Sequence, residues 1–225
     1  MPRPLLAAVL VGALLAACSG GDRPSTAESG TTTTTAPDRL PPEAEAFLDK
    51  AARSADTSFE ATWDVLRKLE GVASRASVLA APGGAARLTV GDLVVVSGER
   101  PATCRTSARA CVDEVREDQL AAFGIFSTFW STGPLDALRV AAGRADAGTP
   151  VTSTRTAAGV TLECVAVPVG SALPATSCIT PEGVFGFVDN PSVRYELTSY
   201  RVGSAAPGAL DVPFPVTEDD SFLSG

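Results

Sequence analysis

The sequence contains no histidine, and this absence removes several kinds of chemistry at once. A Ser-His-Asp or Cys-His catalytic arrangement needs an imidazole as its base, and many metal centres need its ring nitrogen. The only lysines are Lys50 and Lys68, and neither stands in the Ser-x-x-Lys motif of a Ser–Lys dyad. The nucleophile elbow, the phosphate loop and the Gly-rich dinucleotide turn are missing too. We therefore expect no enzyme, no catalytic residue, no metal site and no cofactor, although a sequence never excludes paired carboxylates.

Positive charge is also scarce, with 18 Lys plus Arg against 26 Asp plus Glu and a formal net charge of −8. A nucleic-acid-binding protein needs a basic surface, so we expect no nucleic acid partner. Anionic lipid headgroups would also repel the chain, so any membrane attachment must have another cause. Arginine supplies 16 of the 18 basic residues, a bias typical of a GC-rich genome such as that of an actinobacterium.

Residues 1–17 have the features of an export signal. Arg3 gives a weakly basic start, and the apolar stretch that follows is shorter than the ~20 residues that span a bilayer. The stretch ends in Leu15-Ala16-Ala17-Cys18, which resembles the lipobox of bacterial lipoproteins. The resemblance implies cleavage before Cys18 and lipidation of its thiol; the alternative is an ordinary secretory signal that happens to contain a cysteine. We expect an extracytoplasmic lipoprotein that is anchored to the cell membrane through lipidated Cys18.

The rest of the chain divides into a tether and a folded part. Residues 18–37 are polar and include the run Thr31 to Thr35, so they cannot bury enough apolar surface to fold. Residues 38–225 have the length of one α+β domain. Its tail from about residue 205 is expected to be irregular, and the acidic cluster Glu218-Asp219-Asp220 matches a calcium loop poorly and is expected to be solvated.

Four cysteines remain besides Cys18, and an even number in an exported chain indicates two disulfides. Three connectivities are possible, and we expect the local pairs Cys104–Cys111 and Cys164–Cys178. A zinc site is the alternative. The spacings do not match the close cysteine pairs of such sites, so the disulfides are favoured.

Hydropathy patterns and turn residues predict short antiparallel strands interrupted by two helices. This order is typical of an α+β fold with the helices on one face of the sheet. The expected helices cover residues 42–54, 117–130 and 134–145, and the expected strands cover residues 59–65, 74–81, 85–90, 93–96, 151–156, 160–167, 177–180, 184–189 and 193–202.

The same order of elements, with a first strand of the form Phe59-x-Ala61-x-Trp63, looks like the LppX/LprG group of actinobacterial lipoproteins. More broadly it resembles the LolA/LolB-type half-barrel superfamily. The resemblance implies a curved antiparallel sheet, an open half-barrel, whose concave face is covered by helices. In that family the space between sheet and helices can receive acyl chains of lipids or lipoproteins. The resemblance covers residues 40–202 and rests on element order, so no ligand-binding residue is carried over from it.

Aromatic residues are few, nine Phe, two Tyr and two Trp, and four of them crowd one expected helix. These four aromatics and Trp63 of the first strand are candidates to line an apolar ligand pocket; the alternative is that they are ordinary core residues. Two functions follow: a carrier that binds lipid or an acylated ligand, or an interaction or sensor-accessory module with a closed core that docks on an envelope protein. An apolar void behind the sheet would distinguish them. The candidate residues are Trp63, Phe123, Phe126, Phe129 and Trp130.

Overall fold

The computed structural model describes residues 42–144, 146–170 and 175–223. The expected signal peptide, the lipidation site Cys18 and the tether lie outside these residues. The chain divides into two units, residues 1–34 and 35–225, and every described residue belongs to the second.

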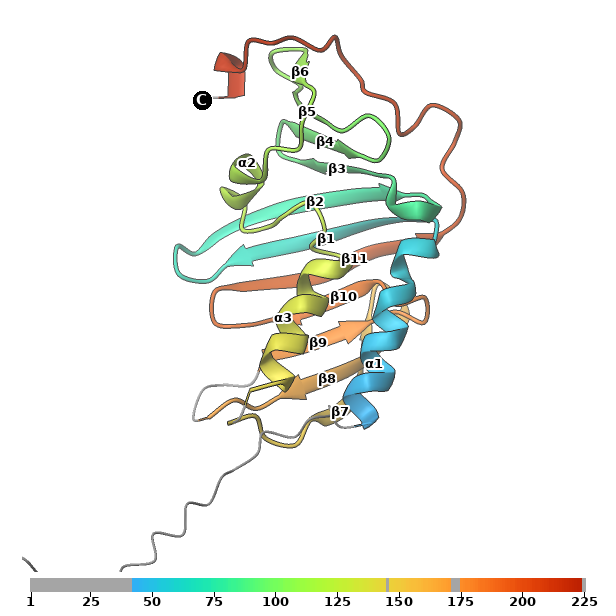
Figure 1. Ribbon diagram of the computed structural model, residues 1–225, viewed down its shortest axis with the longest axis vertical. Helices are drawn as coiled ribbons and strands as arrows, with labels where there is room; N and C mark the ends of the chain where they lie inside the picture. The colour runs from blue at the N-terminus through green and yellow to red at the C-terminus, as the bar shows by residue number, and fades with distance from the viewer. Residues whose placement is uncertain (1–41, 145, 171–174, 224–225) are drawn as a thin grey trace, which may run out of the picture. The chain divides into compact units, whose positions relative to one another are not determined.

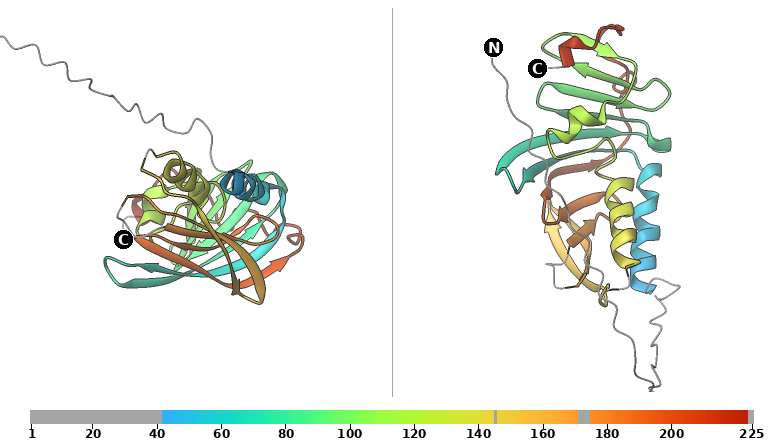
Figure 2. Two further views of the ribbon diagram at one scale, coloured as in Figure 1. Left: turned by 90° about the horizontal axis from the view of Figure 1, so that it is seen from below. Right: turned by 60° about the vertical axis from the view of Figure 1, so that its left-hand side comes forward.

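One antiparallel sheet organises the described part, in the order β6-β5-β4-β3-β2-β1-β11-β10-β9-β8-β7 (Figure 1). The sheet curves without closing and carries helices on its concave side, so the predicted α+β open half-barrel is confirmed (Figure 2). The strands are β1 (Phe59–Arg67), β2 (Val72–Ala80), β3 (Ala86–Val90), β4 (Leu93–Ser97), β5 (Ala102–Arg105), β6 (Ala110–Val112), β7 (Val151–Ala157), β8 (Val160–Val167), β9 (Ala175–Ile179), β10 (Phe185–Asp189) and β11 (Val193–Val202). The helices are α1 (Pro42–Ala52), η1 (Arg53–Asp56), η2 (Pro82–Gly84), α2 (Glu117–Ala121), α3 (Thr132–Ala142) and η3 (Ser221–Leu223).

Helices α1 and α3 lie side by side over the half of the sheet that contains β7 to β11 (Figure 1). Each is amphipathic and turns one apolar stripe to the sheet, as a surface helix must in order to bury its apolar side chains. The expected stripe of α1 is buried, and Leu135 and Leu138 of α3 are buried beside it. No described helix is long and apolar enough to cross a membrane.

The helix expected over residues 117–130 is wrong in extent. Only Glu117–Ala121 is α-helical, and the chain then proceeds through turns to Ser131. Gly124 adopts a φ of +75°, which a right-handed helix does not allow. The aromatic residues that follow are therefore placed by turns rather than along one helical face.

A β-bulge in the pairing of β1 with β11 changes which side chains of β11 face the core. The register with β1 shifts between Thr62 and Trp63, so Leu197 lies opposite Trp63 while Ser199 lies opposite Thr62. Beyond the bulge Tyr200 is turned to the core, with its ring 6.0 Å from that of Phe59. Strict alternation along residues 193–202 would place Ser199 on the same face as Tyr195 and Leu197, and the one extra residue of the bulge reverses that alternation.

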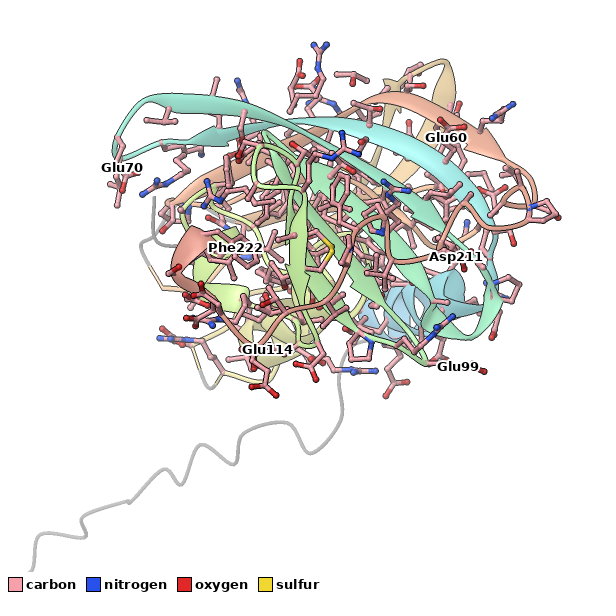
Figure 3. All side chains as sticks on the ribbon, turned by 90° about the horizontal axis from the view of Figure 1, so that it is seen from above. Glu60, Glu70, Glu99, Glu114, Asp211 and Phe222 are labelled. Atoms are coloured by element: carbon pink, nitrogen blue, oxygen red, sulfur yellow. A yellow bond between two sulfur atoms is a disulfide. The ribbon has the colours of Figure 1, made fainter. Side chains whose placement is uncertain are left out.

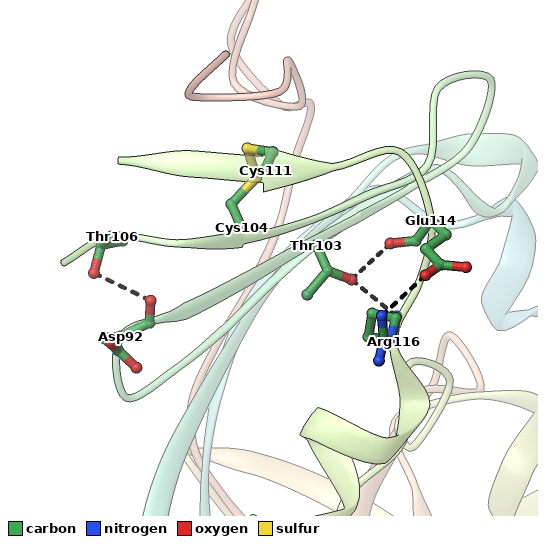
Figure 4. Close-up of a disulfide and its surroundings, with 7 residues drawn as sticks. All are labelled: Asp92, Thr103, Cys104, Thr106, Cys111, Glu114 and Arg116. Atoms are coloured by element: carbon green, nitrogen blue, oxygen red, sulfur yellow. Dashed lines mark hydrogen bonds and ion pairs between the residues drawn. A yellow bond between two sulfur atoms is a disulfide. The ribbon is translucent and has the colours of Figure 1, made fainter. Parts of the chain in front are cut away.

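Both disulfides of the structure are the local pairs expected from the sequence, and each joins two directly paired residues of neighbouring strands. Cys104–Cys111 links β5 to β6, and Cys164–Cys178 links β8 to β9. Beside the first, the buried Thr103 hydroxyl donates to the Glu114 carbonyl (Figure 4). It also accepts from the Arg116 amide, so the chain is fixed to β5 both within the short strand β6 and just after it.

The C-terminal tail is irregular as expected, but it is packed against the fold. The Cys111 amide donates to the Pro215 carbonyl, so the tail covers the outer edge of β6. Leu223 is 2 % exposed, and Phe222 lies on the inner side of the tail while Glu99 and Glu114 point outward (Figure 3). The acidic cluster is exposed as expected, and Asp220 forms an ion pair with Arg116 at 2.8 Å.

Candidate ligand-binding site

Phe129 lies at the centre of a closed aromatic cluster. Its ring centroid is 5.1 Å from that of Trp63, 5.5 Å from that of Trp130 and 5.4 Å from that of Tyr195. All three contacts are edge-to-face, the arrangement that the charge distribution of aromatic rings favours. Trp63 and Phe129 are fully buried, and Trp130 is 6 % exposed. Three of the five candidate residues are therefore brought together, and they pack on one another.

The other two candidates lie apart from this cluster and are half-buried. The Phe123 ring lies against Gly91, where an added Cβ would be 3.3 Å from Cε1. The Phe126 ring fills the space beside Gly133, where an added Cβ would be 1.6 Å from Cε2. Phe126 also borders an open hollow of about 500 Å³. The structure thus distributes the five aromatics over different surroundings instead of around one pocket.

Hydrogen bonds fix the aromatic segment, residues 123–130, to the sheet. The indole of Trp63 donates to the Phe185 carbonyl at 2.9 Å, and the Phe185 amide donates to the Trp130 carbonyl at 2.9 Å. At the start of the segment the Tyr195 hydroxyl donates to the Gly124 carbonyl at 3.1 Å. Burial raises the pKa of that hydroxyl to about 12. The aromatic segment therefore forms a cover over part of the sheet, and hydrogen bonds hold this cover in place at several points.

A small pocket of about 170 Å³ lies at one side of this cover, beside Trp130. Ala80 and Ala86, a directly paired couple on β2 and β3, form its wall on the sheet. The surface that lines it is mostly apolar, but its volume is below the ~300–1,000 Å³ of most small-molecule sites. The lining residues are Ser54, Ala55, Ala80, Ala81, Gly84, Ala85, Ala86, Ser97, Ser127, Thr128, Trp130, Ser131 and Thr132.

Sequence reasoning missed the small residues of this wall. It looked for large apolar side chains, whereas space beside a sheet is left by small ones. The signal was present in the alanines on both sides of the turn Pro82-Gly83-Gly84, which are Ala80, Ala81, Ala85 and Ala86.

A further concavity is an open groove of about 580 Å³ between α1 and the strands β7 and β8. The Lys50 ammonium crosses it to the Glu163 carboxylate at 2.6 Å. Thr152 and Thr154 form its far side. Within the described residues no group of three or more His, Cys, Asp or Glu side chains is arranged to hold a metal ion.

No protein-family model matches the chain, and no curated protein matches it. Solved structures that are similar to it include the MucA/MucB complex of Pseudomonas aeruginosa, at 17 % identity over 76 % of this chain and 61 % of that one, with a TM-score of 0.46. LprF from Mycobacterium bovis is 14 % identical over 76 % of this chain and 98 % of that one, with a TM-score of 0.38. The lipoprotein LppX from Mycobacterium tuberculosis is 14 % identical over 72 % and 97 %, with a TM-score of 0.31. This chain spans about three fifths of the length of the MucB chain. At TM-scores this low the similarity carries no argument about function.

Proposed function

We propose that the protein is a membrane-anchored extracytoplasmic binding protein, without enzymatic activity, that holds an acyl chain in the pocket beside Trp130. The observation that carries the proposal is the pocket itself, which has a mostly apolar surface and lies between the sheet and its cover. A mostly apolar surface is what a lipid chain requires, because each buried CH₂ contributes ~0.8 kcal/mol.

Binding a long chain requires the pocket to grow, since about 170 Å³ is too small for it. The cover can supply this space by moving away from β2 and β3. Of the hydrogen bonds that hold the cover, the one at Trp130 comes from the Phe185 amide of β10, and the lining residues 127, 128 and 130–132 carry no charged side chain. Uptake and release then follow from displacement of the cover, with no covalent step.

The test is native mass spectrometry with lipid extraction on residues 38–225, purified from an exporting host. We expect a lipid at near-unit stoichiometry, and we expect the variant Ala86→Leu, which fills the pocket, to lose it. Ala108→Leu adds the same bulk at an exposed turn and is the matched control. Ala55→Leu fills the mouth of the pocket from an exposed position and serves if the buried substitution impairs folding. Equal lipid content in Ala86→Leu and Ala108→Leu would contradict the proposal.

The anchor is tested separately through Cys18. We expect the full chain to sediment with membranes and Cys18→Ala to leave the membrane fraction. Retention of Cys18→Ala in the membranes would contradict lipidation at this thiol.

A second candidate is an interaction or sensor-accessory module that docks on an envelope protein with its core closed. The edge-to-face cluster around Phe129 favours it, because those rings already occupy one another's apolar surface. A clean apo mass with no uptake of added lipid would favour this candidate over the carrier.

A further inference from the structure

The two edge strands of the sheet, β6 and β7, differ in whether another segment of the chain pairs with their outer side. At β6 the tail forms a parallel bridge between Cys111 and Val216, and the Thr217 amide donates to the Cys111 carbonyl at 2.8 Å. At the other edge β7 pairs with β8 on one side, and among the described residues nothing pairs with its outer side. An unpaired edge presents a row of free backbone donors and acceptors to any other extended strand.

Strand β7 also lacks most of the devices by which proteins protect such edges. Its seven residues contain no proline and no lysine, and its register with β8 runs without a bulge from Val151 to Ala157. Its one charge, Arg155, is engaged elsewhere: the guanidinium stacks over the Phe187 ring at 3.9 Å and bonds the Glu196 carboxylate at 2.5 Å. Residues 151–154 are exposed, with Val151 at 59 %, so the first half of the strand is accessible as well as unpaired, whereas Ala157 at its end is buried.

The side chains of β7 sort cleanly onto two faces. Thr154 lies opposite Glu163, whose carboxylate bonds Lys50 of α1, so the threonines at 152, 154 and 156 face the helix side. Arg155 and its neighbours at alternate positions face the opposite side, where Glu196 lies. The groove between α1 and β7 leaves the threonine face open.

We propose that β7 pairs antiparallel with β7 of a second copy of this chain, about a twofold axis through Thr154. In this register Thr154 faces its own counterpart, and Thr152 lies opposite Thr156 of the other copy. Cross-strand Thr–Thr pairs stabilise sheets. On the other face Ser153 lies opposite Arg155, so like charges do not meet, and the strand carries no carboxylate to add to the net negative charge of the chain. The strand is thus self-complementary, as a twofold interface must be.

Cysteine cross-linking of the full chain in the membranes of an exporting host tests this pairing. In Thr154→Cys the two new thiols would lie on paired residues, whose Cα atoms are about 4.5–5.5 Å apart in an antiparallel sheet. We expect a disulfide-linked species of twice the chain mass on a non-reducing gel. Thr198→Cys places the same change at an exposed position of the internal strand β11 and should remain monomeric.

The register has its own control in Val151→Cys. Its counterpart in the second copy would be about 20 Å away along the strand, so it should not form a link. Equal amounts of disulfide-linked dimer from all three variants, or no dimer from Thr154→Cys, would overturn the proposal. A Thr154→Cys product of another mass would show that a different protein pairs with this edge and would overturn the second copy as its occupant.

Discussion

Replacing Phe129 by alanine tests whether the centre of the molecule is closed core. The side chain is fully buried and meets the rings of Trp63, Trp130 and Tyr195. Truncating a buried Phe costs ~3–5 kcal/mol, and edge-to-face contacts of ~0.5–1.5 kcal/mol each place this site at the upper end. We expect Phe129→Ala to lower the free energy of unfolding by about 4–5 kcal/mol, a large part of the ~5–15 kcal/mol that stabilises a typical domain.

Equilibrium unfolding of residues 38–225 in urea, with both disulfides intact and tryptophan fluorescence as the signal, measures this loss. Phe123→Ala is the matched control, because its ring is half-buried and its loss should cost only about 1–2 kcal/mol. Phe129→Leu provides a milder change if the alanine variant does not fold. A loss below about 2 kcal/mol in Phe129→Ala would refute the reasoning, because the ring would then border removable space rather than fixed neighbours.

Three further changes have expected outcomes. Ala158 adopts a φ of +50° in the turn before Gly159, so Ala158→Asn should raise the free energy of unfolding by about 1 kcal/mol, measured by urea titration; an unchanged midpoint would argue against strain there. Burial raises the pKa of Tyr195 to about 12 and that of Tyr200 as well, so the stability they contribute is complete below pH 10 and is lost as the pH rises toward 12. Phenolate absorbance should therefore stay low at pH 10 until the chain unfolds, and early titration would contradict this. Replacing Cys164 and Cys178 by serine should cost about 3 kcal/mol in the same urea assay, because their bond closes a loop of 14 positions, and a loss under about 1 kcal/mol would speak against that contribution.

Local signals in the sequence were sufficient for the hairpins. Ala158-Gly159 and Gly91-Asp92 stand between alternating strands, and both form the expected turns. The helix over residues 117–130 failed for an equally local reason, because Gly124 takes a positive φ in the middle of an otherwise helical pattern. The four aromatics expected on that helix are placed by turns instead.

Contacts between distant segments could not be predicted in this way. The pairing of β1 with β11 and the packing of Leu223 against the core depend on geometry that no window of neighbouring residues contains. The pocket wall of Ala80 and Ala86 depends on the pairing of β2 with β3 and on the position of Trp130 across from it. Three of the five candidate aromatics are buried and two are half-buried, while the space beside them became visible only in the fold.

The seam between β1 and β11 has a consequence for how the chain reaches its native state. Strands β1 to β6 and strands β7 to β11 each form a run of hairpins between sequence neighbours, and such local contacts form quickly. The seam, in which Phe59 lies opposite Val202, cannot form until the last strand β11 is available. During the proposed export from the N-terminus, the first run would stand across the membrane with β1 paired to β2 on one side and unpaired on the other while β11 is still to arrive. The order of translocation would then set the order in which the strands pair. Until β11 arrives, a chaperone or a neighbouring nascent chain can compete with it for the free edge of β1.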